Sequence, residues 1–383
     1  MPGHAGTGGR DVIFAWEQCK LGDVAKINSG KDYKGLQPGK IPVYGTGGYM
    51  LSVNDKLSDI DAIGIGRKGT IDKPYYLNAP FWTVDTLFYV TPRGTVDISF
   101  MFPLFKNINW KRYDESTGVP SLSKNTIKKI RVSFPQNNEQ VKIGDLFQKI
   151  TQIITLHEEK KRQLECLKSA LLQKMFADEN GYPAVRFRGF DEAWKQCKLG
   201  DVGQTYTGLS GKSKEDFGHG KARFVTYMNI YSNPVSDLNM VEPIEIDERQ
   251  NEVQYGDAFF TTSSETPEEV GMASVWTGDE KHTYLNSFCF GYRPISKINP
   301  YYLAYMLNSQ SLRRKIVILA QGISRYNISK KSVMEIPASL PSAEEQNRIG
   351  LIFKDLDQSI TLYEHKLELL KRLKSSLLQN MFI

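Results

Sequence analysis

The sequence has few of the features that define membrane, metal-binding or disulfide-rich proteins. No apolar run among its 383 residues approaches the roughly 18 residues that a membrane span needs. The four cysteines form no Cys-x-x-Cys pair and the five histidines add no cluster, which excludes a structural zinc site. So few cysteines also argue against a disulfide scaffold, and we expect a reducing, cytoplasmic location. The composition, 40% hydrophobic and 24% charged, predicts packed globular domains.

Motifs for nucleotide or cofactor binding are present only in incomplete form. Gly64 to Gly69 have the spacing of a dinucleotide-binding loop, but Thr70 to Pro74 do not favour the helix that must follow. Gly208 to Ser213 resemble the end of a phosphate-binding loop whose first glycine is replaced by Tyr206. Asn299 to Tyr302 lack the second proline of an amino-methyltransferase motif. We therefore expect a non-catalytic chain that binds no cofactor and no metal.

The sequence contains a strong internal repeat. AWEQCKLGDV, from Ala15 to Val24, recurs as AWKQCKLGDV from Ala193 to Val202, with nine identities in ten at an offset of 178. A second pair of segments, Glu139 to Phe176 and Glu345 to Phe382, matches at an offset of 206. The chain is therefore a duplicated unit whose second copy carries 28 extra residues between its opening motif and its closing segment.

We expect each copy to end in a long helix, because its closing segment is rich in Leu, Lys, Gln and Glu and has no proline. About 38 residues per helix span about 57 Å. Apolar residues at a 3-4 spacing predict a coiled-coil pair that acts as a spacer, and two amphipathic helices on separate domain cores are the alternative. The expected seam positions of the two helices are Ile143, Leu146, Ile150, Ile153, His157, Lys160, Leu164, Leu167, Leu171 and Lys174, and Ile349, Ile352, Leu356, Ser359, Tyr363, Lys366, Leu370, Leu373, Leu377 and Asn380.

The segments between the repeated motifs predict mixed α/β domains with many short strands, since they are rich in glycine and aromatic residues and alternate in polarity, as in VDTLFYV and DAFFTTSS. The expected organisation is a disordered or non-native tail over residues 1–9 and a first domain over 10–137. A spacer helix over 138–178, a second domain over 179–340 and a second spacer helix over 341–383 follow.

Charge is distributed unevenly along the chain. Residues 1–138 hold 18 Lys and Arg against 12 Asp and Glu, which accounts for the whole net charge of +6. In the second domain, residues 281–334 contain nine basic residues and no acidic one. A segregated basic surface favours binding to nucleic acid phosphates, and a solvated basic face without a partner is the alternative.

Taken together, these segments resemble the specificity subunit of type I restriction-modification systems. Duplication, order and motifs agree over nearly everything after residue 10. The resemblance rests on the two opening motifs and on the two closing segments that predict long helices. It also rests on Ile65 to Val90, Gly118 to Pro135, the stretches that begin at Phe259 and Tyr284, and Gly322 to Pro341.

The resemblance implies an α/β (α+β) protein with two target-recognition domains in a pseudo-twofold arrangement, separated by an antiparallel coiled coil of two long helices. Each domain would read one half of a split target in double-stranded DNA. The repeated frames would dock two adenine-N6 methyltransferase subunits and, through them, restriction subunits; S-adenosylmethionine, ATP and Mg²⁺ belong to those partners. A coiled-coil scaffold that joins proteins without DNA specificity is the alternative function.

Family analogy and charge together select candidate DNA-binding residues in both domains. Basic side chains hold phosphates, and some arginines pair with guanine. The candidate DNA-binding residues of the first domain are Lys31, Lys34, Arg67, Lys68, Lys73, Arg112 and Lys124. Those of the second domain are Lys212, Lys214, Arg223, Arg313, Arg314, Arg325, Asn327 and Lys330.

Overall fold

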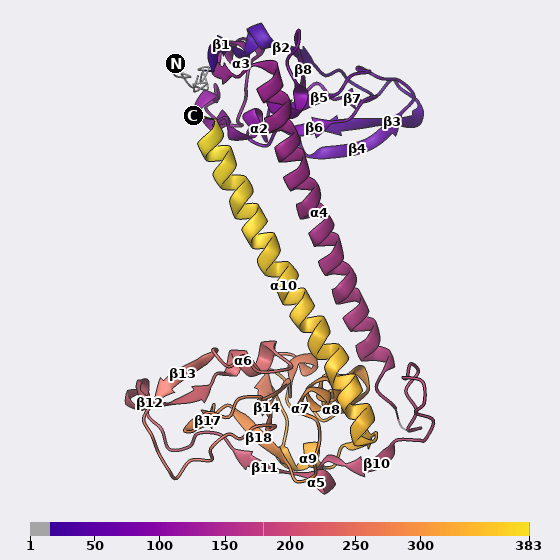
Figure 1. Ribbon diagram of the computed structural model, residues 1–383, viewed down its shortest axis with the longest axis vertical. Helices are drawn as coiled ribbons and strands as arrows, with labels where there is room; N and C mark the ends of the chain where they lie inside the picture. Colours follow the sequence, from indigo (N-terminus) through magenta and orange to yellow (C-terminus); the bar gives the residue numbers. More distant parts are fainter. Residues whose placement is uncertain (1–15, 179, 383) are drawn as a thin grey trace, which may run out of the picture. The chain divides into compact units, whose positions relative to one another are not determined.

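The computed structural model describes residues 16–178 and 180–382, so the predicted tail over residues 1–9 lies outside the described residues. The chain forms two compact units, and each includes part of both long helices (Figure 1). Unit 1 comprises the described residues up to Glu158 and from His365 onward, and unit 2 comprises Glu159–Glu364. Within the described residues, no helix has both the length and the apolar character needed to cross a membrane.

Unit 1 is built on a four-stranded antiparallel sheet of order β2-β8-β5-β6, a three-stranded sheet of order β4-β3-β7 and the pair β1-β9. The core includes Leu21, Phe88, Phe100 and Trp110. Its elements are β1 (Glu17–Lys20), α1 (Leu21–Val24), β2 (Ala25–Ser29), β3 (Pro38–Gly45), β4 (Gly48–Val53), β5 (Ala62–Gly66), β6 (Tyr75–Leu77), β7 (Trp82–Thr83), β8 (Leu87–Pro92), α2 (Ile98–Asn107), the 3-10 turn η1 (Trp110–Tyr113), α3 (Lys124–Lys129) and β9 (Arg131–Phe134).

Unit 2 repeats this topology, with sheets of order β11-β18-β14-β16, β13-β12-β17 and β10-β20, and adds the short pair β15-β19. The fold class predicted from the sequence, two mixed α/β domains with two long helices, is confirmed. The elements of unit 2 are β10 (Lys195–Lys198), α5 (Leu199–Val202), β11 (Gly203–Thr207), η2 (Lys214–Asp216), β12 (Phe217–Val225), α6 (Tyr227–Ser232), β13 (Val241–Ile244), β14 (Ala258–Thr261), β15 (Ser263–Ser264), η3 (Pro267–Glu269), β16 (Ala273–Val275), β17 (Thr283–Leu285), β18 (Cys289–Pro294), α7 (Pro300–Leu307), α8 (Gln310–Ile318), β19 (Tyr326–Asn327), α9 (Lys330–Met334) and β20 (Pro337–Leu340).

The long helices are α4 (Asn137–Lys174) and α10 (Ala343–Met381), and they run antiparallel within each unit. In unit 1, Ile150 and Ile154 of α4 pack against Leu367 of α10. In unit 2, partly buried residues of α4 pack on the core that contains Ile349 and Phe353. Both helices therefore bury one face against a partner helix, as a coiled-coil seam requires.

Half of the predicted seam positions are wrong, and the displacement is one residue in both helices. Leu146, Ile153 and Leu167 are 39–47% exposed, whereas Phe147 and Ile154 are buried. The sequence offers apolar residues at both i+3 and i+4, so a 3-4 and a 4-3 spacing fit it equally well. Packing against the globular cores selects the 4-3 spacing.

Lysines occupy several positions of the observed seam and form polar contacts with the opposite helix. Lys168 Nζ lies 2.5 Å from an Asp357 carboxylate oxygen in unit 2, and Lys161 Nζ lies 2.9 Å from a Glu364 oxygen. In unit 1, Lys374 donates to the Thr151 hydroxyl over 2.7 Å. Polar seam contacts of this kind specify the register of paired helices.

A tryptophan–glutamate hydrogen bond joins each opening motif to the first turn of a long helix. Trp16 Nε1 donates to Glu139 over 3.1 Å, and Trp194 Nε1 donates to Glu345 over the same distance. Glu345 is 1% exposed and also accepts two 2.8 Å hydrogen bonds from the Arg186 guanidinium. In unit 2, this bidentate ion pair neutralises a carboxylate that is otherwise buried without charge compensation.

The glutamine that follows each of these glutamates makes a second repeated contact. Gln140 accepts from the backbone N–H of Asp97, and Gln346 accepts from that of Asn299, over 3.0 and 3.1 Å. Each glutamine amide also donates to the proline carbonyl five residues earlier. The recurring Glu-Gln pair is thus explained by its tie to the opening motif and to the cap of α2 or α7.

We expect Glu345→Gln to destabilise unit 2 by about 3 kcal/mol, because the Arg186 charge would remain in its site without a counter-charge. The neighbouring Glu344 pairs with Arg348 at the surface and is 69% exposed, so Glu344→Gln is a matched control expected to change stability by less than about 0.5 kcal/mol. Urea unfolding of the full chain, followed by tryptophan fluorescence, measures both. Equal midpoints for the two variants would contradict the assigned role of the pair.

Candidate nucleic-acid interface

A pair of main-chain segments, hereafter the strand-exit seam, occupies the same place in both units. It joins the residues just after β5 or β14 to the residues just before α3 or α9. In unit 1, Leu122 N–H donates to the Arg67 carbonyl over 2.9 Å, and in unit 2 Ile328 N–H donates to the Thr262 carbonyl over 3.0 Å. The equivalent bridges join Lys68 to Ser121 and Ser263 to Asn327.

Serine N-caps complete the strand-exit seam and place one lysine at the same position in each unit. Ser123 and Ser329 accept hydrogen bonds from the third residue of α3 and α9, respectively. Lys124 and Lys330 are the first residues of those helices. The two units therefore hold different side chains on one shared backbone frame.

The strand-exit seam of unit 1 is cationic. The Arg67 guanidinium lies 5.9 Å and the Lys124 ammonium 6.0 Å from the centre of the Phe88 ring. Arg67 also donates to the Asp85 carbonyl over 3.5 Å, and both Arg67 and Lys68 are exposed. The structure thus brings three of the seven predicted residues of the first domain together in a group suited to phosphate contacts.

The other four predicted residues of the first domain lie elsewhere in unit 1. Lys31 and Lys34 are exposed in the loop between β2 and β3, and Lys73 is exposed in the loop before β6. Arg112 is exposed in η1. None of the contacts among the described residues joins these four side chains to the cationic seam. Their role in DNA binding stays a prediction.

In unit 2 the strand-exit seam borders a cleft of about 510 Å³, hereafter the Tyr–Arg cleft. Arg325 is exposed there, and its Nε and Nη2 lie 3.3 and 3.1 Å from the Ser263 hydroxyl. Asn327 is also exposed, and its amide nitrogen donates to the Arg325 carbonyl over 3.3 Å. The residues that line the cleft include Tyr227, Tyr231, Ser263, Glu265, Phe288 and Arg325.

Hydrogen bonds hold the walls of the Tyr–Arg cleft in place. The rings of Tyr227 and Tyr231 stack at 6.1 Å, and Tyr227 donates to the Ser263 carbonyl over 3.0 Å. Tyr231 donates to Glu269 over 2.7 Å. That bond, with others from nearby hydroxyl groups, lowers the pKa of the Glu269 carboxyl, so Glu269 is ionised at neutral pH. The cleft combines a cation, carboxylates and aromatic surface.

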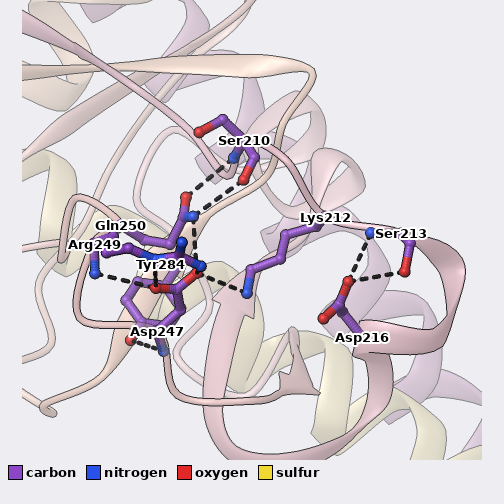
Figure 2. A network of polar contacts seen from close by, with 8 residues as sticks. All are labelled: Ser210, Lys212, Ser213, Asp216, Asp247, Arg249, Gln250 and Tyr284. Carbon is purple, nitrogen blue, oxygen red and sulfur yellow. Dashed lines mark hydrogen bonds and ion pairs between the residues drawn. The ribbon is translucent and has the colours of Figure 1, made fainter.

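Lys212 belongs to a polar network rather than to a free cationic surface (Figure 2). Its ammonium lies 2.9 Å from Asp247, and both side chains are about 10% exposed or less. Asp247 also binds Arg249, and these partners lower the pKa of the Asp247 carboxyl. Gln250 exchanges hydrogen bonds with the backbone of Ser210. The network holds the loop that precedes η2, so Lys212 has an anchoring contact here, and its expected phosphate contact stays a prediction.

Arg313 also has a structural role. Its guanidinium donates to the carbonyls of Glu268, Val270 and Gly271 over 2.6–2.9 Å, and burial lowers its pKa. Its neighbour Arg314 is exposed on α8. Arg313 thus fixes the loop after η3, and only Arg314 of this pair extends into solvent.

The remaining predicted residues of the second domain lie apart from the Tyr–Arg cleft lining. Arg223, on β12, lies 3.9 Å from Glu280. Lys214 is exposed in η2, and Lys330 is half-buried at the start of α9. No cluster of His, Cys, Asp or Glu suited to a metal ion occurs among the described residues.

Sequence reasoning missed Tyr227, Tyr231, Ser263, Glu265 and Phe288. Tyr227 and Phe288 lie on α6 and just before β18, so no local spacing links them. Phe288 is 62% exposed, which is unusual for a large aromatic side chain, but exposure is not visible in a sequence. Only the sheet topology brings these residues to one cleft.

The two α/β units thus carry unlike side chains on like backbone frames. A family model described as the type I restriction modification DNA specificity domain matches residues 15–166 and 191–372. The chain belongs to this family.

Individual proteins agree with this assignment. A putative type I restriction enzyme specificity subunit from Methanocaldococcus jannaschii is 22% identical over 220 residues, which cover 55% of this chain and half the length of that relative. The crystal structure of a type I restriction-modification S subunit from M. genitalium matches 97% of both chains, with a TM-score of 0.61 and 15% identity. An HsdS subunit from Thermoanaerobacter tengcongensis matches 98% of both chains, with a TM-score of 0.50 and 16% identity. At these identities the structural matches show a shared fold.

We expect Arg313→Ala to destabilise unit 2 by roughly 1.5–3 kcal/mol, because three backbone carbonyls lose a charged hydrogen-bond donor. Arg314→Ala removes the same charge from the next position of α8, and a change within about 0.5 kcal/mol is expected. Thermal or urea unfolding of the two variants measures the difference. If Arg314→Ala is the more destabilising change, the anchoring role of Arg313 is wrong.

Proposed function

We propose that the chain is the DNA sequence-recognition subunit of a type I restriction-modification complex and is not itself catalytic. Each unit reads one half of a bipartite target in double-stranded DNA. The observation that carries this proposal is the strand-exit seam, where Arg67 and Lys68 of unit 1 correspond to Thr262 and Ser263 of unit 2. Two unlike reading surfaces on one frame are what an asymmetric target requires.

The repeated frames are the proposed docking sites for two methyltransferase subunits. Gln18 and Lys20 of the first opening motif are exposed, and so are the identical Gln196 and Lys198 of the second. Identical exposed residues, in domains whose other surfaces differ, support binding of the same partner to both frames. Restriction subunits would join through those partners.

Cofactor chemistry belongs to the partner subunits in this proposal. S-adenosylmethionine would serve adenine-N6 methylation in the methyltransferase, and ATP with Mg²⁺ would serve the restriction subunits. Since the proposed substrate is cellular DNA, we place the protein in the cytoplasm.

Exchange of the second reading surface tests the proposal. Residues Gly203 to Asn327 begin with β11 and end with β19, so replacing them with the equivalent segment of a relative keeps both opening motifs and both long helices. We expect one half of the methylated sequence to change and the other half to remain. Mapping of methylated adenines in cells that carry the whole system measures this.

The result of the exchange separates the proposal from the scaffold alternative. Reciprocal exchange of residues Ala25 to Ser121 in unit 1 is the matched control and should change only the opposite half. If a folded, assembled hybrid keeps both halves of the original sequence, the exchanged segment does not read DNA. A coiled-coil scaffold would then be the better explanation.

We further propose that the long helices set the unspecified gap between the two half-sites, because both run from one unit into the other. Inserting one heptad after Lys161 and another before Glu364, which are ion-paired, keeps the seam in phase. Each helix gains about 10 Å, equivalent to about three base pairs. We expect the same two half-sites with a gap about three base pairs longer. Methylation mapping that returned the original gap at full efficiency would refute this role.

A further inference from the structure

We propose that Arg325 is a guanine-reading residue of unit 2 and presents its guanidinium from the Tyr–Arg cleft to the O6 and N7 atoms of a guanine in the DNA major groove. This inference rests on the proposed function and deepens it by assigning a base to a side chain. It follows from the orientation of the guanidinium, the charges that share its cleft and the contrast with unit 1.

The hydrogen bonds of Arg325 leave the recognition edge of its side chain available. Nε and Nη2 both contact the Ser263 hydroxyl, which orients the plane of the guanidinium from one side. Among the described residues, Nη1 has no acceptor and no carboxylate forms an ion pair with Arg325. The Nη1–Nη2 edge has the fork geometry that pairs with guanine O6 and N7.

The backbone beneath Arg325 is fixed, so the orientation does not depend on one hydroxyl contact alone. Ser263 pairs with Asn327, two residues beyond Arg325, in the short sheet β15-β19. Tyr227 donates to the Ser263 carbonyl, and Ser263 is 7% exposed. Arg325 directly precedes β19 (Tyr326–Asn327), so the paired strand anchors the backbone next to it and limits the conformational freedom lost on binding.

The carboxylates of the cleft favour a base edge over a phosphate. Glu265 is exposed and lines the same cleft as the ionised Glu269. Both repel a phosphate group, whereas a base edge is neutral. A carboxylate also accepts a hydrogen bond from the amino group of cytosine, so arginine and glutamate together suit a G·C pair.

Unit 1 gathers more cations at the equivalent place, although both units share a lysine at the start of α3 or α9. There Lys68 stands where unit 2 has Ser263, and Arg67 and Lys124 lie near the Phe88 ring. That group suits phosphates, because it gathers cations. The contrast indicates that the Tyr–Arg cleft, rather than an equivalent cationic seam, carries base recognition in unit 2.

The test uses the full chain assembled with its proposed adenine methyltransferase partner. The wild-type motif is mapped first, and methylation rates are then measured on duplexes that carry each single base change. We expect Arg325→Ala to lower discrimination at one G·C position by about 5- to 150-fold, and to leave the other half-site unchanged. Arg325→Lys keeps the charge but not the fork, so it should lose discrimination at the same position. Arg188→Ala, at an exposed arginine of unit 2 that is not a DNA-binding candidate, is the matched control.

The possible outcomes separate this inference from the proposed function. If Arg325→Ala weakens binding to all sequences alike and makes the salt dependence shallower, Arg325 contacts a phosphate and the inference is wrong. The inference also fails if discrimination is unchanged in both Arg325 variants while the wild-type motif is recovered, and the proposed function then stands. If the wild-type assembly shows no sequence-dependent methylation, both fail.

Discussion

The tie between each opening motif and the start of a long helix is the interaction on which the rest of each unit depends. Trp16 bonds to Glu139 in unit 1 and Trp194 bonds to Glu345 in unit 2. The end of the other long helix completes each site, since the Phe382 ring lies 5.9 Å from Trp16, and Phe176 packs in the core that contains Trp194. Each globular part is therefore bound to two helix ends by aromatic contacts, which are partly buried in unit 1 and buried in unit 2.

This constant frame separates the residues that hold the fold from those that are free to vary. The strand-exit seam is fixed by backbone hydrogen bonds, as between Leu122 and Arg67, which do not depend on side-chain identity. Side chains at the seam can therefore differ between units without a cost to the sheet. Lys68 in one unit and Ser263 in the other are the clearest example.

Charge along the chain did not separate the cations that face solvent from those that hold the fold. Lys212 is held by Asp247, and Arg313 is held by backbone carbonyls, although charge and family analogy had selected both as DNA-binding candidates. Arg325 has the same side-chain charge, and among the described residues its guanidinium bonds only to the Ser263 hydroxyl. The function of each cation depends on which acceptors the fold brings within reach.

The sequence by itself determined the duplication, the two long helices and the mixed α/β class, because these depend on local pattern and on identity between copies. Only the tertiary structure decided which residues form the coiled-coil seam, since Leu146 and Phe147 are both apolar and the globular core buries just one of them. It also decided the Tyr–Arg cleft, because Tyr227, Phe288 and Arg325 are far apart in the chain and meet through sheet topology. Local pattern carries periodicity and composition, whereas long-range pairing determines which side chains share a surface.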